Sequence, residues 1–473
     1  MRKTAIITLF LLGLRTISFS QSLDDYLKTA AENNPELKAY FNEYLAALEQ
    51  VPQVGSLPDP ELSMGFFIQP MERFMGNQQA DIQLMQMFPW FGMLRTQKDE
   101  ANKMALAQFE EFQDAKNQLF YQVKSTWYQL YRLEEEIRIT EENLDILKKY
   151  ERLALIRFQS AGTDSGSGSM QENAPMKEES RSSSGAAMGS MASGMNTGST
   201  SGNTSSTNKA SMGASRPMAA TGSGMSDVLR ARMEVRELES TLAFLRDSRM
   251  PLQAEFNQLL NRNIHEDIVV SGSLTDTALS LERLALLDSI TQNNPMLRML
   301  GAETEAYEAQ QKMARLEGRP MLGAGVNYMP FSPRTEDGMA MGGDDMIMPM
   351  VRLSIPIYRK KYSALRKEAE LKQQAVQHRR ENTVNQLSTQ WASALRDLDD
   401  AIRRAALYRE QSTLARQTMN LLMTSYTTNG RDFEEVLRVQ QQLLDYQLRL
   451  FTAIVDQHTT VAMLEMLAAS ELN

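Results

Sequence analysis

The chain has 473 residues, of which 42% are hydrophobic and 23% are charged, so it is long enough to bury a large core. Its formal net charge is −9 and it has no basic cluster, which argues against a nucleic-acid partner. It contains no cysteine, which excludes disulfides and thiolate metal ligands.

The first twenty residues have the pattern of a secretory signal peptide. A positive start, Met1-Arg2-Lys3, precedes a short apolar run from Ala5 to Leu14, and small residues follow at Ser18 and Ser20. We therefore predict that residues 1–20 are cleaved on export. No later apolar segment reaches the ~20 residues that a helix needs to cross a bilayer, so membrane contact is expected only through strands or the surface.

The remaining chain contains an internal repeat. Asn33-Asn34-Pro35 lies in a helix-like run, and Asn293-Asn294-Pro295 lies in a second such run further along the sequence. Similar segments follow each of them in the same order. A duplicated unit of this size indicates an architecture rather than a local motif, and we predict a first repeat over 21–262 and a second over 263–473.

Two short runs with period-two alternation follow the Asn-Asn-Pro helix in each repeat. In the first run, Leu62, Met64 and Phe66 alternate with small or polar residues, and in the second repeat Leu322 and Val326 do the same. The other two runs surround Ile82-Gln83-Leu84 and Val351-Arg352-Leu353. One apolar and one polar face is typical of a strand with lipid on one side and water on the other.

Two very long helices and two shorter ones complete the repeats. From about Leu94 to Ser160 there is neither proline nor glycine, and apolar residues recur at steps of three and four, as in Leu119, Val123 and Trp127. The ranges 360–426, 227–260 and the carboxyl-terminal run from Val436 have the same character. At about 1.5 Å per residue, the longest helix is expected to extend on the order of 100 Å.

A segment of about 60 residues interrupts the first repeat where the second has a short turn. Residues 164–225 are rich in serine and glycine and lack Leu, Ile, Val and aromatic residues, which predicts disorder. Their only large apolar side chains are methionines, and thioethers suit Cu(I) and Ag(I). The candidate metal ligands are Met170, Met176, Met188, Met191, Met195, Met212, Met218 and Met225. The alternative is an inert low-complexity linker.

Together, the signal peptide and the doubled unit of helix, two strands and two long helices resemble the TolC family of outer-membrane efflux channels, in particular its heavy-metal (CusC-like) type. The Asn-Asn-Pro helix is one characteristic segment of that family. The turn from Tyr426 to Leu437, with Asn429-Gly430-Arg431-Asp432 at its centre, is another.

The resemblance implies a mainly α fold with a small β part. Three chains would form a 12-stranded β-barrel in the outer-membrane lipid, continued by an α-helical barrel in the periplasm. It also implies that the protein is not an enzyme and requires no cofactor, and that its partners are a periplasmic adaptor and an inner-membrane pump, expected to be of the RND type. Cu(I) or Ag(I) is the expected cargo.

The resemblance also suggests residues that close the periplasmic tip. In some relatives carboxylates near the start of the last helix hold the tip closed, and those positions fall here on Glu435 and Arg438. Tyr426 and Arg431 correspond to tip residues that bond to neighbouring helices. The alternative is that Glu435 and Arg438 form the solvated face of a coiled coil.

Two further interpretations stay open from the sequence. The same channel could export drugs or a secreted protein, because only the methionines bear on cargo. A non-transporting coiled-coil scaffold or adhesin of the cell envelope belongs to a different class, and the alternating strands argue against it.

Overall fold

A computed structural model describes residues 22–163, 223–270, 272–277, 282–336, 338–429 and 433–470. The predicted signal peptide, Arg431 and the methionines from Met170 to Met218 lie outside these ranges. None of the helices within them combines the length and apolar character needed to cross a membrane.

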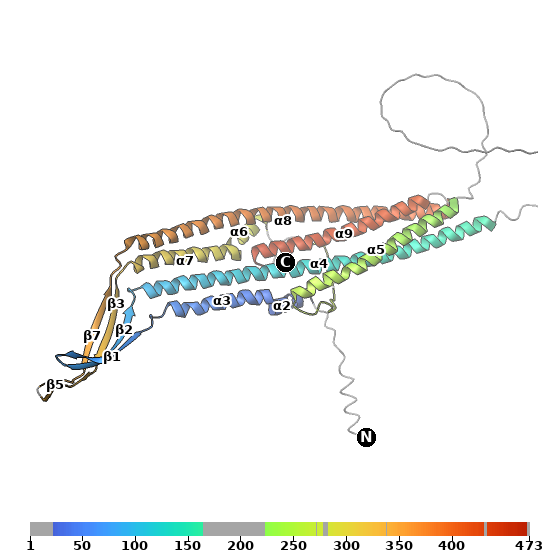
Figure 1. The fold of residues 1–473 in the computed structure, drawn as a ribbon. Helices are drawn as coiled ribbons and strands as arrows, with labels where there is room; N and C mark the ends of the chain where they lie inside the picture. The colour runs from blue at the N-terminus through green and yellow to red at the C-terminus, as the bar shows by residue number, and fades with distance from the viewer. Residues whose placement is uncertain are drawn as a thin grey trace, which may run out of the picture.

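The predicted long helices are present and run side by side along the molecule (Figure 1). Helices α4 (Met93–Thr163) and α8 (Arg359–Asn429) each have 71 residues, which gives a length on the order of 100 Å. Helix α5 (Ser223–Leu259) packs on α4, and α9 (Phe433–Ala468) packs on α8. Met225 is therefore helical, which corrects the predicted boundary of the disordered insert by about three residues.

Each Asn-Asn-Pro motif joins a short helix to a longer one. In the first repeat, α2 (Leu23–Asn33) meets α3 (Pro35–Val54), and in the second, α6 (Arg283–Asn293) meets α7 (Pro295–Glu317). The second asparagine is the N-cap of the longer helix, and the proline takes its first position, where no N–H is needed.

The cap asparagines also fix the motif to another helix. The Asn34 side chain accepts from the Leu37 N–H (3.0 Å) and donates to the Leu259 carbonyl at the end of α5 (3.1 Å). Asn294 accepts from the Met296 N–H (3.1 Å) and donates to the Leu467 carbonyl at the end of α9 (3.0 Å). One side chain thus starts one helix and satisfies a terminal carbonyl of another.

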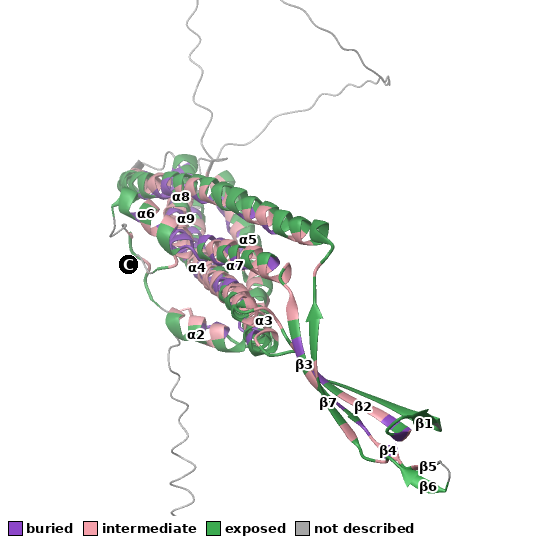
Figure 2. Cartoon of the chain, turned by 90° about the vertical axis from the view of Figure 1, so that its left-hand side faces the viewer, coloured by how far each residue is buried: buried purple, intermediate pink, exposed green. Residues whose placement is uncertain are grey.

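The sheet extends from one end of the helices (Figure 2). Its long antiparallel strands are β1 (Glu61–Arg73), β2 (Gly76–Phe88), β3 (Met321–Met329) and β7 (Met346–Ser354), in the order β1-β2-β3-β7. The short β4 (Phe331–Ser332) pairs with β2, while β5 (Arg334–Glu336) pairs with β6 (Met339–Met341). The two repeats therefore contribute two long strands each to one sheet.

The core is a series of apolar seams between the long helices. The stripe predicted on α4 is buried at Leu119, Val123, Trp127, Leu130 and Leu133. Val123 and Trp127 pack with Tyr26 of α2 and Phe256 of α5, so the amino-terminal helix is held against the first repeat. A second seam places Leu286 of α6 against α8 and α9.

We expect Asn294→Ala to destabilise the protein by about 1–3 kcal/mol. The substitution removes the N-cap, worth about 1 kcal/mol, and leaves the Leu467 carbonyl without its partner. Asn294→Asp keeps the cap acceptor but lacks the N–H donor, so its stability should lie between that of the wild type and that of Asn294→Ala. The measurement is the midpoint of thermal unfolding, followed by circular dichroism.

The control is Asn293→Ala. The Asn293 amide donates only to the exposed Ser289 hydroxyl (3.2 Å), so its loss should change the midpoint little. Equal effects of Asn293→Ala and Asn294→Ala would contradict the double role of Asn294.

Candidate functional site

The two faces of the sheet differ in polarity and exposure, and the exposed face is the apolar one, which is the reverse of a water-soluble domain. We call the face that carries Leu62, Leu84, Val326 and Val351 the convex face, and the other the concave face. Val351 on the convex face is 83% exposed, whereas Asn327 on the concave face is 7% exposed. The convex face is mainly apolar; its polar residues are Gln86, whose amide donates to the Pro58 carbonyl (2.7 Å), and, beyond the register shift in β1, Gln78 and Arg73.

The strand register fixes which residues share each face. Leu62 pairs with Leu84, Leu84 with Val326, and Val326 with Pro349, so one apolar row crosses all four long strands. Ser63, Gln83 and Asn327 form a polar row on the concave face. Across this face, Glu61 of β1 and Arg352 of β7 approach to 3.8 Å. The predicted alternation is confirmed, with the apolar side chains exposed.

The sheet has open edges. Strands β1 and β7 lie at the two ends of the strand order, so each presents one row of backbone N–H and C=O groups that the four-stranded sheet does not pair. An exposed apolar face next to unpaired edges is compatible with lipid only if other chains pair with those edges.

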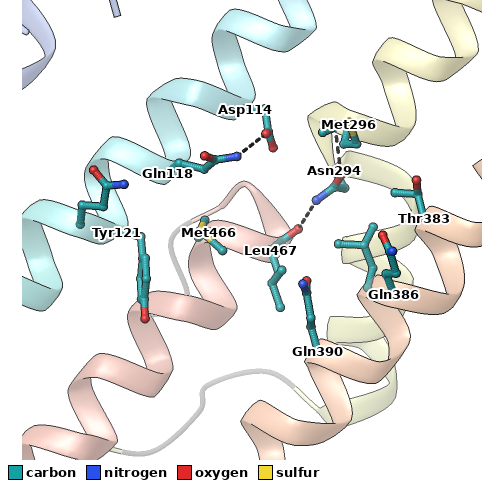
Figure 3. A pocket seen from close by; sticks show the side chains of 12 residues that line it. Asp114, Gln118, Tyr121, Asn294, Met296, Thr383, Gln386, Gln390, Met466 and Leu467 are labelled. Carbon is teal, nitrogen blue, oxygen red and sulfur yellow. Dashed lines mark hydrogen bonds between the residues drawn. The ribbon is translucent and has the colours of Figure 1, made fainter. Parts of the chain in front are cut away.

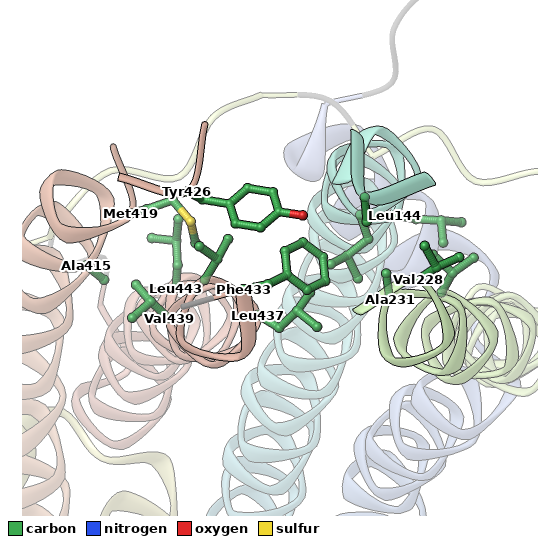
Figure 4. Close-up of a cluster of buried hydrophobic side chains, with 14 of the residues drawn as sticks. Leu144, Val228, Ala231, Ala415, Met419, Tyr426, Phe433, Leu437, Val439 and Leu443 are labelled. Atoms are coloured by element: carbon green, nitrogen blue, oxygen red, sulfur yellow. The ribbon is translucent and has the colours of Figure 1, made fainter. Parts of the chain in front are cut away.

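At the opposite end of the molecule, the four long helices meet in an apolar cluster (Figure 4). Tyr426 of α8 is 3% exposed, and its ring lies 5.0 Å from that of Phe433 at the start of α9. Burial raises the pKa of the Tyr426 hydroxyl, and the nearby Asp227 carboxylate adds to the rise. Burial likewise raises the pKa of Asp227.

Arg157 of α4 connects the two repeats at this cluster. Its guanidinium donates to the Tyr426 carbonyl and lies 4.9 Å from the centre of the Tyr426 ring. The resemblance assigned Tyr426 to bonding with a neighbouring helix, and Arg157 is the partner that it has in this structure. Arg431 lies outside the described residues.

A charged group on the surface joins α5 to α9. Arg230 of α5 forms an ion pair with Glu434, and Arg438 lies 3.7 Å from the same carboxylate. Arg230, and then Arg438, hold the pKa of Glu434 below its ordinary value near 4.5. Glu435 is exposed, and the described part of the chain offers it no ion-pair partner. Of the two predicted gate residues, Arg438 therefore contacts Glu434, and the role of Glu435 in the gate stays a prediction.

Arg157, Arg230 and Glu434 were not predicted from the sequence. Arg230 follows Val228-Leu229 as Arg438 follows Val436-Leu437, so the internal repeat contained the signal for it. Arg157 lies next to Phe158, the repeat counterpart of Tyr426, but no pattern around it indicates a bond to the other repeat.

A hollow of about 380 Å³ lies between α4, α7, α8 and α9 beside the cap residue Asn294 (Figure 3). Asp114 accepts from the Gln118 amide (2.6 Å), and burial raises the pKa of Asp114. Gln386 and Gln390 line the opposite wall. These are helix-packing amides without a nucleophile and base pair, and the described residues hold no group of three His, Cys, Asp or Glu that could bind a metal ion.

No sequence-family model matches the chain, and no curated protein matches it in sequence. Solved structures do match its fold over nearly its full length. The outer-membrane channel OprN gives a TM-score of 0.67 at 13% identity, covering 95% of this chain and 90% of its own. VceC, an outer membrane protein of Vibrio cholerae, gives 0.66 at 13% identity, with coverage of 95% and 97%.

CusC, whose structures describe transmembrane channel formation, gives a TM-score of 0.65 at 14% identity, covering 97% of this chain and 94% of its own. The predicted fold class is thus confirmed: the chain has the duplicated, mainly α fold of these outer-membrane channels.

We expect Glu434→Gln to loosen the ends of α5 and α9. Loss of the charge removes the pair with Arg230, so backbone amides near residues 224–235 and 433–441 should exchange with deuterium severalfold faster at pH 7. Because the Glu434 pKa is lowered, the pair stabilises the tip above the ordinary pKa near 4.5 and is lost as the pH falls through the lowered value. Variant and wild type should therefore converge at low pH. Mass spectrometry measures the exchange.

Glu435→Gln is the matched control, since it removes the same charge one residue away. It should leave exchange at the tip unchanged. A larger effect from Glu435 than from Glu434 would return the tip contact to the residue predicted from the sequence.

Proposed function

We propose that this chain, which has the fold of outer-membrane channels, is the outer-membrane exit channel of a tripartite efflux system in a Gram-negative cell. It conducts substrate passively and performs no chemistry. An inner-membrane pump, of the RND type, supplies the free energy, and a periplasmic adaptor joins the pump to the helical tip. The exposed apolar convex face of the sheet is the observation that carries this proposal.

Lipid is the solvent that fits this face. Ile68, Phe66, Ile347 and Val351 are at least two-thirds exposed in the single chain, and their strands alternate with polar or small residues on the concave side. In water such a surface would drive aggregation. In a bilayer it forms the outward band of a β-barrel whose interior is polar.

The open edges require a closed ring of strands. Three copies, each with four long strands, make a 12-stranded barrel in which β1 of one chain pairs with β7 of the next. The resemblance described above favours this homotrimer. The long helices of the three chains would then continue the barrel into the periplasm as an α-helical tube.

Copper(I) or silver(I) is the cargo that we favour. The candidate ligands Met170 to Met218 lie outside the described residues, and their support is chemical: thioethers bind soft monovalent ions and remain available where thiols would be oxidised. Helix α5 begins at Ser223 and α4 ends at Thr163, so the segment between them is anchored at the tip. We propose that it collects the ion at the entrance.

Two alternatives predict different behaviour. A channel for drugs or a secreted protein would have the same sheet and tip. A non-transporting scaffold or adhesin has no use for four strands with an exposed apolar face, and that face argues against it.

Membrane insertion can be tested with one substitution on each side of β7. Val351→Arg places a charge on the convex face, which costs about 2–4 kcal/mol at the bilayer midplane. Met348→Arg places the same charge on the concave face and should be tolerated. Cell fractionation and a gel with and without heating measure the folded outer-membrane trimer. A trimer that tolerates both substitutions equally, or no membrane trimer from the wild type, would contradict the channel.

Cargo is tested by growth inhibition with copper, silver and a drug panel in a strain that lacks this gene. We expect the full chain to restore metal resistance and a chain without residues 165–222 to restore it only in part. Equal rescue of drug resistance by both chains, without rescue of metal resistance, would make the protein a general efflux channel with an inert insert.

A further inference from the structure

Methionine is sorted between the two faces of the sheet. At the paired positions, the concave face carries seven methionines together with small or charged and polar residues, and no Leu, Ile, Val or aromatic side chain. The concave positions are Glu61, Ser63, Gly65, Glu72, Asn77, Asp81, Gln83, Met85, Met87, Met321, Gly323, Gly325, Asn327, Met329, Met346, Met348, Met350, Arg352 and Ser354.

The convex face has the opposite composition. Its methionines among the paired positions of the four long strands are Met64 and, beyond the register shift in β1, Met71, and branched or aromatic residues such as Leu84, Val326, Ile347 and Val351 dominate. Methionine used only as an adaptable filler would occur on either face. Its concentration on the concave face, seven against two, where it stands among polar neighbours, points to a property of the sulfur.

Two of these sulfurs converge over a glycine. A Cβ at Gly323 would lie 2.6 Å from the Met87 sulfur and 3.3 Å from the Met85 sulfur, so the two sulfurs are at most about 5.9 Å apart. With a metal–sulfur bond of about 2.3 Å as the scale, sulfurs that share an ion lie within about 4.6 Å. A small rotation of either flexible side chain achieves this. Both methionines are on β2, two residues apart, and therefore project to the same side.

A second glycine keeps the neighbouring space open. Gly325 pairs with Met85 on one side and Met350 on the other, so the three residues form a row across β2, β3 and β7. A Cβ at Gly325 would lie 2.5 Å from the Leu84 carbonyl oxygen and 3.0 Å from the Met85 sulfur, so no side chain fits there. Glu61 pairs with Met85 in the same row, and its carboxylate lies 3.8 Å from the Arg352 guanidinium.

We propose that Met85 and Met87, with Met350 across Gly325, form a thioether site for Cu(I) or Ag(I) on the concave face of the sheet. Soft sulfur donors select these ions over the harder Na⁺, K⁺ and Mg²⁺. The site lies within one chain, so it does not depend on assembly. Its place on the exit path rests on the proposed function, in which the concave face lines the channel.

The binding test uses the purified full chain in detergent and silver nitrate as the probe. Titration calorimetry of Met85→Leu/Met87→Leu should show about one Ag(I) fewer per chain than the wild type. Leucine conserves volume and apolar character, so the sheet should persist. The matched control, Met64→Leu/Met339→Leu, removes two thioethers that are 58% and 73% exposed and lie away from this pair. It should bind as the wild type does.

A second measurement guards against misfolding of the variant. In the wild type labelled at the methionine methyl carbon, Ag(I) should shift the NMR signals of Met85 and Met87, assigned from the two single variants. An unchanged stoichiometry in the double variant, or unmoved signals in the wild type, would overturn the site.

Single-channel currents in potassium nitrate test the metal site and the channel function independently of each other. We expect Ag(I) to interrupt the current of the wild type and of the control more often than that of Met85→Leu/Met87→Leu. A conducting channel that Ag(I) affects equally in all three proteins would overturn the site while keeping the channel. A wild type that binds Ag(I) at Met85 and Met87 but never conducts would keep the site and refute the proposed function.

Discussion

The unpaired edges of β1 and β7 constrain everything else about this molecule. Each edge presents a row of backbone donors and acceptors beside an apolar convex face, and hydrocarbon offers these groups no partner. Water would satisfy the edges but not the face, and lipid would satisfy the face but not the edges. The ring of chains proposed above would satisfy both. The long helices leave the sheet as continuations of its strands, so a ring of strands also arranges the helices in a ring.

The parts of this architecture that the sequence predicts are those encoded locally. A helix of 71 residues repeats its apolar stripe many times, so chance interruptions do not hide it. The Asn-Asn-Pro motif places an N-cap residue directly before a proline suited to the first helical position, so it indicates a helix start. Alternation around Leu62 or Leu322 gives the strand and its two faces, although not which strands are neighbours. That β2 pairs with β3 of the other repeat depends on the three-dimensional fold alone.

The tip is less predictable because its contacts join distant segments. Arg230 and Glu434 are 204 residues apart, and Arg157 and Tyr426 are 269 apart, so no local spacing relates them. The choice between Glu434 and Glu435 depends on the rotation of α9, since adjacent residues point about 100° apart on a helix. A one-residue uncertainty in the sequence comparison therefore covers both carboxylates, and in this structure Arg438 contacts Glu434. The buried Val436 and Leu437 fix that rotation, and they leave Glu434 on the side of α5.

Thioethers at two places along one duct have a physical rationale if the cargo is a soft ion. The proposed collector is anchored at the tip, and the proposed site on the concave face lies beyond the far end of α4, a distance on the order of 100 Å. A conducting path must bind well enough to admit an ion and weakly enough to release it. Neutral thioethers meet that condition better than thiolates. Both are soft ligands that suit Cu(I), but a thioether carries no negative charge to neutralise the ion and so holds it less tightly. Arg352, one row from Met85, lies 3.8 Å from the Glu61 carboxylate, so the two charges offset each other beside the proposed site. A pair of neutral thioethers beside this balanced ion pair is suited to passing a soft ion rather than storing it.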